Sequence, residues 1–401
     1  MSKTKIAIKN SRDPYETTQP RMPHNEEFWR WGDDNLFPNL LSLLSHRAVT
    51  HRRIINDKAD YITGKGFVCD TQQSLLTNFV ASANAHGESL RQVLSRVAFD
   101  KMLFANAFVE VVRNAAQSSL AIYHIDATKC RVAKDSRHII IHSNWAEYRP
   151  SEATHLPLYP YFEEQADGSQ RCVIHYKDYE PMFQHYGIPQ YIAGLNVSAI
   201  AYKTDKWNIS RLDNSFQMSG VMLLDNTADN DLDAERIVRT AEEKFGGKPG
   251  QVLFVLKDGS EYDNSRFISL NETSEGDWTA LHEQANNDIV VAHSWFRSLS
   301  GLDYTTSFST DRILHEYEIA LNTIILAEQE ELMEPIVEVL QRELGIDTSS
   351  LSIINRPPTT SKPIYMKVWE ARKADGLDYD ETDEKQQLFL SQITSYSITE
   401  I

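Results

Sequence analysis

Cysteine is scarce in this chain. Three cysteines occur in 401 residues, at positions 69, 130 and 172, and they lie far apart in the sequence. Their odd number and the lack of any Cys-x-x-Cys pair argue against a disulfide framework and against a zinc site. We interpret them as small apolar side chains of a protein made in a reducing compartment.

Long hydrophobic runs are also missing. No stretch of about 18 consecutive apolar residues occurs, so we expect no membrane span. The first segment, Met1 to Arg21, is polar and has no apolar centre, so we expect no secretion signal. The protein should therefore be soluble and intracellular when it is made.

Positive charge is in the minority. There are 40 Lys and Arg against 57 Asp and Glu, which gives a net charge of −17. A protein that grips DNA through its phosphates needs a basic excess or a basic face, so a conventional DNA binder is disfavoured. The acidic balance still suits a protein past which DNA must slide without sticking.

Local motifs for catalysis and metal binding are missing. The glycine-rich segment 246–250 has no Ser or Thr after its lysine and follows a helical pattern, so it is interpreted as a helix stop. His282 and His315 are each followed by glutamate but lack a second histidine four residues after the first. The acidic cluster 378–384 lacks the features of a calcium loop. We expect no cofactor and no metal, and the chain is predicted not to be an enzyme. A nuclease or peptidase with dispersed site residues stays an alternative.

What the sequence does contain is the composition of a globular protein, with 41% hydrophobic and 10% aromatic residues. The aromatic segment 28–38 is expected to dock on a core. Apolar periodicity predicts an α+β first half, with helices over 39–62 and 89–106 and strands over 107–113, 120–125, 130–133, 138–142 and 172–176.

The second half reads as a stalk that carries a small insertion. Gly187 opens a helix to 217, and a second helix over 278–299 returns. Between them lie predicted strands over 218–224, 251–256 and 267–270 and a helix over 231–245. A polar loop, 300–309, leads to a long acidic helix, 310–344, which Pro335 is expected to kink. A strand over 351–354, a proline linker and a charged, mostly helical tail follow.

Both stalk helices are rich in apolar side chains, which favours packing against neighbouring copies. An ordinary helical core within one chain is the alternative. The side chains concerned are Ile192, Leu195, Ala199, Trp207 and Leu212 in the first helix, and Trp278, Leu281, Ile289, Val290, Trp295 and Phe296 in the second.

This order of parts resembles the phage portal family from about Phe28 to Pro358. Residues 104–113 are similar to the family's Gly-Asn-Ala-Tyr-x-Glu stretch, with Ala105 in place of the glycine and Phe108 in place of the tyrosine. Residues 186–191 resemble the opening of its stem helix. Further similarities occur at 125–132, 214–222, 288–293 and 334–336, and the order and spacing of all six stretches carry the resemblance.

The resemblance implies a portal fold with an α/β wing, a two-helix stem, a small β/α clip, a tunnel loop, a long kinked helix and a helical C-terminal crown. Its parts would be an N-terminal arm (1–27), wing (28–186), stem helix (187–217), clip (218–273), stem helix (274–299), tunnel loop (300–309), long kinked wing helix and strand (310–362) and crown (363–401).

The resemblance also implies a function. Such subunits form a homo-oligomeric ring at the portal vertex of a bacteriophage capsid. In the virion this ring is commonly a dodecamer. Double-stranded DNA is packaged and later ejected through this channel. The implied partners are the terminase large subunit, the head–tail connector or adaptor and the major capsid protein. The implied location is the virion, reached from the host cytoplasm, with no role at a membrane. A structural head or adaptor protein without a DNA channel remains an alternative.

The DNA-facing residues implied by this mapping lie in the tunnel loop, which has no Lys or Arg near its start; a plain helix connector is the alternative. They are Ser300, Gly301, Leu302, Asp303, Tyr304, Thr305 and Thr306. As a separate hypothesis, Lys203, Lys206 and Arg211 provide rare phosphate contacts.

Overall fold

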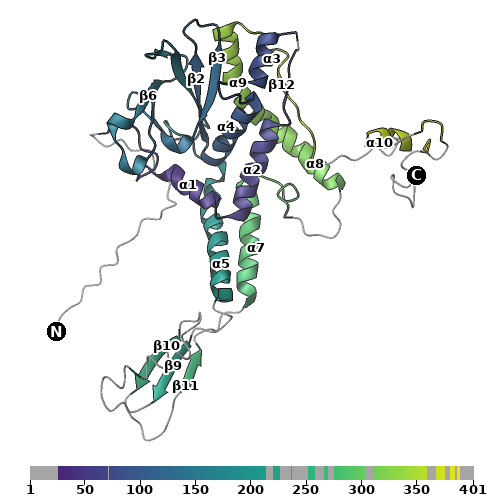
Figure 1. Cartoon of the computed structure of the whole chain (residues 1–401). Helices are drawn as coiled ribbons and strands as arrows, with labels where there is room; N and C mark the ends of the chain where they lie inside the picture. The colour runs from purple at the N-terminus through teal and green to yellow at the C-terminus, as the bar shows by residue number, and fades with distance from the viewer. Residues whose placement is uncertain are drawn as a thin grey trace.

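The computed structural model describes residues 26–70, 72–213, 220–225, 236, 252–257, 266–269, 275–302, 310–358, 367–374, 380–383 and 386–388. Helices and strands are mixed within it, so the predicted α+β class is confirmed. Figure 1 shows a body of helices and sheets, two helices that extend from it, and a small sheet beyond their far ends.

The aromatic segment after residue 26 docks on the body as expected. Phe28 is buried and forms a β-bridge with Ala133, and Trp31 lies in the core. Two helices follow, α1 (Phe37–Ser45) and α2 (Val49–Thr63). The prediction of one helix over 39–62 was therefore wrong. Ala48 has an extended conformation (φ −101°, ψ 104°), and this break lets both helices bury their apolar faces.

The helix α2 ends at Thr63, one residue beyond the predicted end, and Gly64 follows it with a φ of +61°. Strand β1 (Phe67–Val68) then pairs with β12 (Ser352–Ile353) from the other end of the chain. A helix that the sequence did not predict, α3 (Ser74–Ala81), comes next.

The helix α4 (Leu90–Phe104) shows why its boundaries were predictable. Ser89 and Gln92 form a capping box at its start. Ala105 closes it in the left-handed conformation, and β2 (Asn106–Arg113) follows at once. A backbone with φ of +54° is one that glycine adopts easily, in keeping with the glycine in the motif that residues 104–113 resemble.

Two antiparallel sheets form the rest of the body. The first has the order β3-β2-β8-β7, and the second has the order β4-β5-β6. The predicted strands are present, and β6 and β7 were not predicted. The bounds are β3 (Leu120–Ile125), β4 (Cys130–Val132), β5 (His138–Ile141), β6 (Thr154–Pro157), β7 (Glu163–Glu164) and β8 (Gln170–Lys177). Short 3-10 turns lie at Ala127–Lys129 (η1), Trp145–Glu147 (η2) and Pro150–Glu152 (η3).

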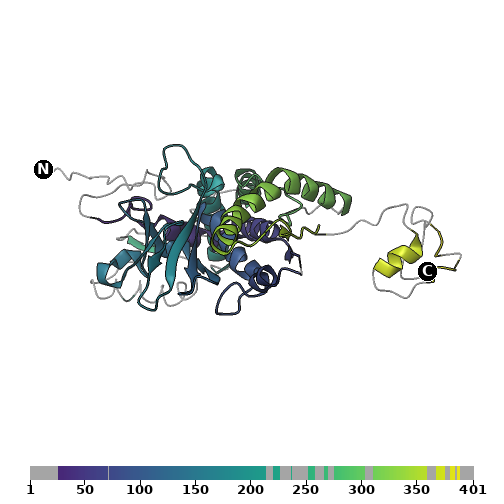
Figure 2. The ribbon, with the colours of Figure 1, turned by 90° about the horizontal axis from the view of Figure 1, so that it is seen from above.

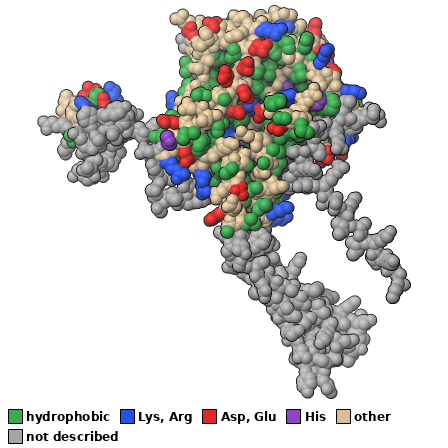
Figure 3. Space-filling view, turned by 180° about the vertical axis from the view of Figure 1, so that it is seen from behind, with side chains coloured by type: hydrophobic (Ala, Val, Ile, Leu, Met, Phe, Trp, Pro, Cys, Tyr) green, Lys and Arg blue, Asp and Glu red, His purple; other side chains and the backbone are tan. Residues whose placement is uncertain are grey.

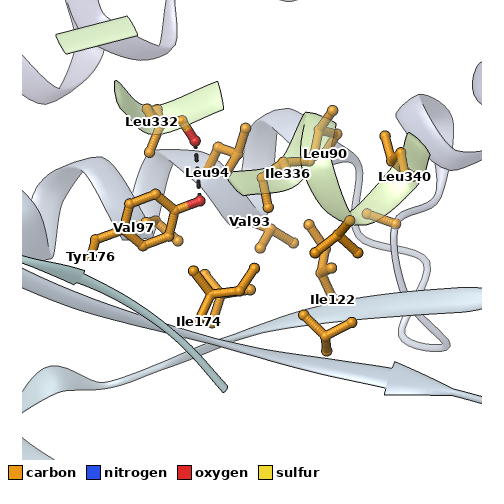
Figure 4. Close-up of a cluster of buried hydrophobic side chains, with 14 of the residues drawn as sticks. Leu90, Val93, Leu94, Val97, Ile122, Ile174, Tyr176, Leu332, Ile336 and Leu340 are labelled. Atoms are coloured by element: carbon orange, nitrogen blue, oxygen red, sulfur yellow. Dashed lines mark hydrogen bonds between the residues drawn. The ribbon is translucent and has the colours of Figure 1, made fainter. Parts of the chain in front are cut away.

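The main core forms where α4 lies between the first sheet and α9 (Leu326–Leu344). Figure 4 shows side chains from the three elements converging. The hydroxyl of Tyr176 on β8 donates a 3.1 Å hydrogen bond to the carbonyl of Leu332 on α9. The labelled apolar side chains are Leu90, Val93, Leu94, Val97, Ile122, Ile174, Leu332, Ile336 and Leu340.

The stalk consists of α5 (Leu195–Asp213), entered through the 3-10 turn η4 (Gln190–Gly194), and α7 (Glu275–Ala292). Beyond it lie the predicted strands, now β9 (Gly220–Asp225), β10 (Val252–Lys257) and β11 (Arg266–Ser269), in the order β10-β9-β11. Because β10 runs parallel to β9, a crossover must join them. The helix predicted over 231–245 for this crossover lies outside the described residues, apart from Arg236, which is helical.

The prediction that the returning helix runs to Leu299 was wrong. It ends at Ala292, and Ser294 adopts a left-handed φ of +48°. The amide of Trp295 bonds back to the carbonyl of Val290 at 3.1 Å, which closes the helix. Residues up to Leu302 form turns.

The long acidic helix is divided. It comprises α8 (Thr310–Ala320), a π-helical turn η5 (Leu321–Ile325) and α9, which continues through Pro335. Figure 1 shows α8 leading away from the body at an angle to α9, and a π turn is a recognised cause of such bends. In the tail, the structure describes α10 (Val368–Ala374), which lies apart from the body in Figures 1 and 2.

Candidate functional site at the junction of body and stalk

The start of the stalk is fixed by one buried amide side chain. Asn106 is fully buried. Its Nδ2 donates to the carbonyls of Phe104 (2.8 Å) and Gly187 (3.0 Å), and its Oδ1 accepts from the amide of Gly187 at 3.0 Å. Two of the segments that resemble portal motifs, 104–113 and 186–191, therefore contact each other directly.

Gly187 sits where no side chain fits. A Cβ added there would lie 2.4 Å from the carbonyl oxygen of Ala105 and 2.8 Å from that of Asp178. Both obstacles are backbone atoms and have no rotamer to change. The glycine at this position is thus required by close backbone approach.

The turn η4 brings an aromatic residue into the junction. The hydroxyl of Tyr191 donates to the carbonyl of Leu103, and its ring stacks on His293 with centroids 4.7 Å apart. Burial raises the pKa of Tyr191 well above its ordinary value, so the hydroxyl remains a donor. Tyr191 therefore links the end of α4 to the end of α7.

A pair of buried histidines joins α2 to the end of α7. His51 Nδ1 and His293 Nε2 are 2.8 Å apart, so one ring donates and the other accepts. Burial lowers the pKa of His51 to about 4, with a further contribution from Arg52. Burial also lowers the pKa of His293 well below its ordinary value. Both rings are neutral at pH 7, and such a pair can bond with one ring as the donor and the other as the acceptor.

Lys58 on α2 caps the end of α7. Its Nζ donates to the carbonyl of His293 at 2.6 Å and lies 5.6 Å from the centre of the Trp295 ring. Burial lowers the pKa of Lys58 to about 8, although Glu328 and Asp178 act to raise it. A cation is favourable there because the last carbonyls of a helix carry partial negative charge.

A second buried lysine, Lys101, forms ion pairs with three carboxylates close to Lys58. Lys101 Nζ lies 3.0 Å from Asp178, 2.5 Å from Glu328 and 2.9 Å from Glu331. Burial acts to lower the pKa of Lys101, but Asp178 and Glu328 outweigh it and the pKa is raised. Burial raises the pKa of Asp178 to about 6. A cavity of about 290 Å³ lies between these groups, Lys58 and His293.

The segment after α7 is held against α8. The amide of Ser298 donates to Glu316 at 3.3 Å, and its hydroxyl donates to the same carboxylate. The hydroxyl of Ser300 donates to the carbonyl of Phe296 at 2.8 Å, and Arg297 donates to that of Leu302 at 3.4 Å. Residues 296–302, which lead into the predicted DNA-facing loop, are therefore held by hydrogen bonds within the chain.

The predicted loop residues are only partly described. Ser300 differs from the expectation, because it is only 6% exposed and its hydroxyl is used within the chain. Gly301 is exposed with a φ of +70° and has no atom within 4 Å of an added Cβ, and Leu302 is half-buried. Asp303, Tyr304, Thr305 and Thr306 lie outside the described residues.

The basic residues singled out on the first stalk helix lie on α5. Lys203 and Lys206 are exposed, and the side chain of Arg211 lies outside the described residues. Figure 3 shows lysine and arginine side chains scattered over the face it presents, with no broad basic patch on its described surface.

The apolar side chains of the stalk divide into two groups. Leu195, Ala199, Ile289, Val290 and Trp295 are buried within the chain, so the hypothesis that they pack on neighbouring copies was wrong for them. Ile192 and Phe296 are partly buried against the same clusters. An exposed group remains, comprising Ile200, Ile209, Leu281 and Val291. The side chains of Trp207, Leu212 and Trp278 lie outside the described residues.

Metal-type and cysteine chemistry find no support in the described ranges. Among those residues, no group of three or more His, Cys, Asp and Glu side chains is placed to hold a metal ion. All three cysteines are free, and Cys130 and Cys172 are buried as expected. No helix in the described part of the chain is long and apolar enough to cross a membrane.

Comparison with known proteins gives consistent matches. The sequence model of the family described as "Phage portal protein" matches residues 70–292, more than half of the chain. A "Probable portal protein" of Haemophilus phage HP1 is 22% identical over 301 residues, which cover 71% of this chain and 78% of that protein. An uncharacterized protein of Rickettsia felis is 24% identical over 231 residues, which cover 57% of this chain and 55% of that protein.

Solved structures show the same fold in larger particles. A chain from the neck of an empty gene transfer agent particle, computed with C6 symmetry, gives a TM-score of 0.55 at 13% identity. The match covers 89% of this chain and 96% of that one. A chain from the neck of the native particle, computed with C12 symmetry, gives 0.52 at 13% identity, with 86% and 95% covered. At this identity the likeness concerns the fold.

Proposed function

The chain belongs to the phage portal protein family, and on this premise we propose that it is the subunit of a ring through which double-stranded DNA enters and leaves a phage-like particle. The observation that carries the proposal is the extent of the family match, which includes both stalk helices and the sheet between them. The family is structural rather than enzymatic, so the ATP hydrolysis that drives packaging belongs to a partner.

We propose a closed ring of twelve copies in the virion. The gene transfer agent necks that share the fold were computed with C12 and C6 symmetry, which supports a cyclic assembly. A ring of identical subunits needs one face of each copy to fit a different face of the next. Exposed apolar side chains on the stalk, such as Leu281 and Val291, are available for such a contact.

The parts of the chain take the roles that the resemblance implied. We propose that the small sheet β9–β11 belongs to the clip, which docks the terminase large subunit during packaging and the head–tail connector afterwards. The body would be the wing, and the residues after 363 would form the crown inside the capsid, near the major capsid protein.

The loop 300–309 is proposed to face the DNA. The net charge of −17 favours a channel wall that repels phosphates, so that DNA slides rather than binds. Within the loop, Gly301 is exposed and unobstructed, which suits a backbone that approaches a passing duplex. Lys203, Lys206 and Arg211 are proposed as the rare phosphate contacts.

Electron microscopy of the purified protein, with native mass spectrometry of the same sample, tests the proposal. Rings with an open central hole are expected. Closed discs without a hole would favour a structural adaptor instead. A protein that stays monomeric even when it is expressed together with its capsid proteins would contradict the ring.

The phosphate contacts have their own test. In rings of the double variant Lys203→Glu with Lys206→Glu, packaged DNA per particle is expected to fall while ring formation is kept. Unchanged packaging in these rings would rule out the contacts. Glu163→Lys with Glu164→Lys on β7, which is an exposed pair on the body, is the matched charge-change control.

A further inference from the structure

We propose that Lys58 and the His51–His293 pair are positioning residues, which fix segment 293–302 and so set where the start of loop 300–309, Ser300 to Leu302, stands relative to the body. The inference rests on the proposed function only in assigning that loop to the DNA. The juxtaposition itself is a property of the fold, and it can be tested without DNA.

The first observation is the cap on the helix end. The helix α7 ends at Ala292, and the carbonyl of the next residue, His293, is one that the helix leaves without an intrahelical partner. Lys58 comes from α2, far away in the sequence, and supplies the donor at 2.6 Å in a buried contact. Lys58 is itself only 5% exposed, so its charge was taken out of water to make this bond.

The second observation is that His293 is also held through its side chain. Its ring bonds to His51 on α2 and stacks on Tyr191 of η4. About two turns earlier in the stalk, the hydroxyl of Thr50 donates to Asn286 Oδ1 at 2.7 Å. The helix α2 therefore bonds to α7 at more than one point along its last turns.

The third observation is that the residues between His293 and the loop are themselves held by contacts. Ser294 reverses the backbone with its left-handed φ, and Trp295 lies under the Lys58 ammonium group. Ser298 then bonds to Glu316 on α8, the helix that follows the loop. The segment before loop 300–309 and the helix after it are thus both held in place by these contacts. A shift at His293 would therefore move Gly301 as well.

The carboxylates around Lys58 favour its protonated form, which donates the hydrogen bond to His293. The groups that face Lys58 are Lys101 from α4, Asp178 from the segment before η4 and Glu328 from α9, in addition to His293. The two carboxylates favour a charged Lys58, and a charged donor makes the stronger hydrogen bond. A methionine at position 58 would keep the chain length but leave the His293 carbonyl buried without a donor.

Hydrogen–deuterium exchange of the full-length protein tests the proposal. In Lys58→Met, amides of residues 293–302 are expected to exchange about tenfold faster or more, since a bond from a charged donor is lost. Amides of β2 and β8 should keep their wild-type rates. Lys58→Arg, which retains a cation at that position, should restore most of the protection.

Arg53→Met is the matched control, because Arg53 lies on the same helix but is exposed and pairs with Asp57 at the surface. Equal exchange at 293–302 in Lys58→Met and Arg53→Met would overturn the proposal. So would a uniform rise throughout the body, because that would make Lys58 a general core residue. If Lys58→Met fails to fold, His51→Gln is measured instead, and wild-type exchange at 293–302 in that variant would overturn it.

Packaging by the same rings separates this inference from the proposed function. Faster exchange at 293–302 with normal DNA packaging would support the positioning role of Lys58 and contradict the DNA-facing role of the loop. Faster exchange with reduced packaging would support both.

Discussion

At the residue scale, Gly187 has no room for a side chain. Its missing side chain allows the backbone of Ala105 and Asp178 to approach, and the side-chain amide of Asn106 then bonds to both the N–H and the carbonyl of Gly187. This contact sets the point at which the stalk leaves the body.

Gly187→Ala should destabilise the fold by about 2–3 kcal/mol or more, because the new Cβ overlaps backbone atoms that cannot rotate away. Urea unfolding followed by circular dichroism measures the change. Gly345→Ala is the control: that residue is also a glycine, with φ of +63° and open space around its Cβ. Its cost should be about 1 kcal/mol, from backbone strain alone. Similar losses in the two variants would contradict the close-approach argument.

His51 gives the fold a dependence on acidity. Its pKa is about 4 in the folded state against 6.5 in the unfolded state, because it is buried. Between these values the unfolded chain binds more protons, so stability rises with pH there and is lost as pH falls, by up to about 3 kcal/mol. Asp178 acts with the opposite sign, because its folded pKa is raised to about 6.

The difference between wild type and His51→Gln isolates this contribution. The wild type should be the more stable protein at about pH 7, and its advantage should shrink toward about pH 4.5 as its histidine becomes costly to keep neutral. Urea midpoints across this range provide the measurement. A difference that does not vary with pH would show that His51 does not titrate as a buried neutral ring.

At the element scale, Lys101 connects three parts of the body that the chain does not join directly. It projects from α4 and meets Asp178 before the stalk and two glutamates on α9. Since Lys101 is only 4% exposed, its charge is retained by these partners and not by water.

Lys101→Met should cost about 3–5 kcal/mol, because Asp178 and Glu328 are left close together without their cation. Arg96→Met on the same helix removes an exposed ion pair with Glu88 and should cost less than about 1 kcal/mol. Urea unfolding again supplies the comparison. Equal losses would indicate that the Lys101 cluster is as weak as a surface pair.

At the scale of the whole molecule, the stalk carries apolar surface that the single chain does not cover. Val291 is 76% exposed at the end of α7, and Leu281 and Ile209 are exposed on the stalk helices. In the proposed ring these side chains meet the neighbouring copy.

Val291→Glu should prevent ring formation while leaving the monomer folded, because each interface would bury an unpaired charge at a cost of about 3 kcal/mol or more. Native mass spectrometry counts the copies, and circular dichroism checks the fold. Leu75→Glu on α3 changes an apolar side chain that is 62% exposed on the body, and its rings should persist. Rings of normal stability from Val291→Glu would place the interface elsewhere.

Sequence patterns located most elements of the molecule but not all of their ends. The predicted helix start at 89 and helix end at 62 lie within one residue of those in the structure, where Ser89 caps α4 and Gly64 follows α2, and both residues act within one turn of the chain. The ends at Ala48 and Ala292 were missed. Each of these depends on what the next segment contacts, and local periodicity continues through both.

The order of elements, the α+β class and the similarity to portal proteins were determined by the sequence itself, since apolar periodicity and short motifs are local properties. The junction was decided only by the tertiary structure. Lys58, Lys101 and His293 each carry a side chain that is usually found at a surface, and nothing near them in the sequence predicts burial. Their partners lie far along the chain, so the pairs exist only once α2, α4, α7 and α9 have packed together.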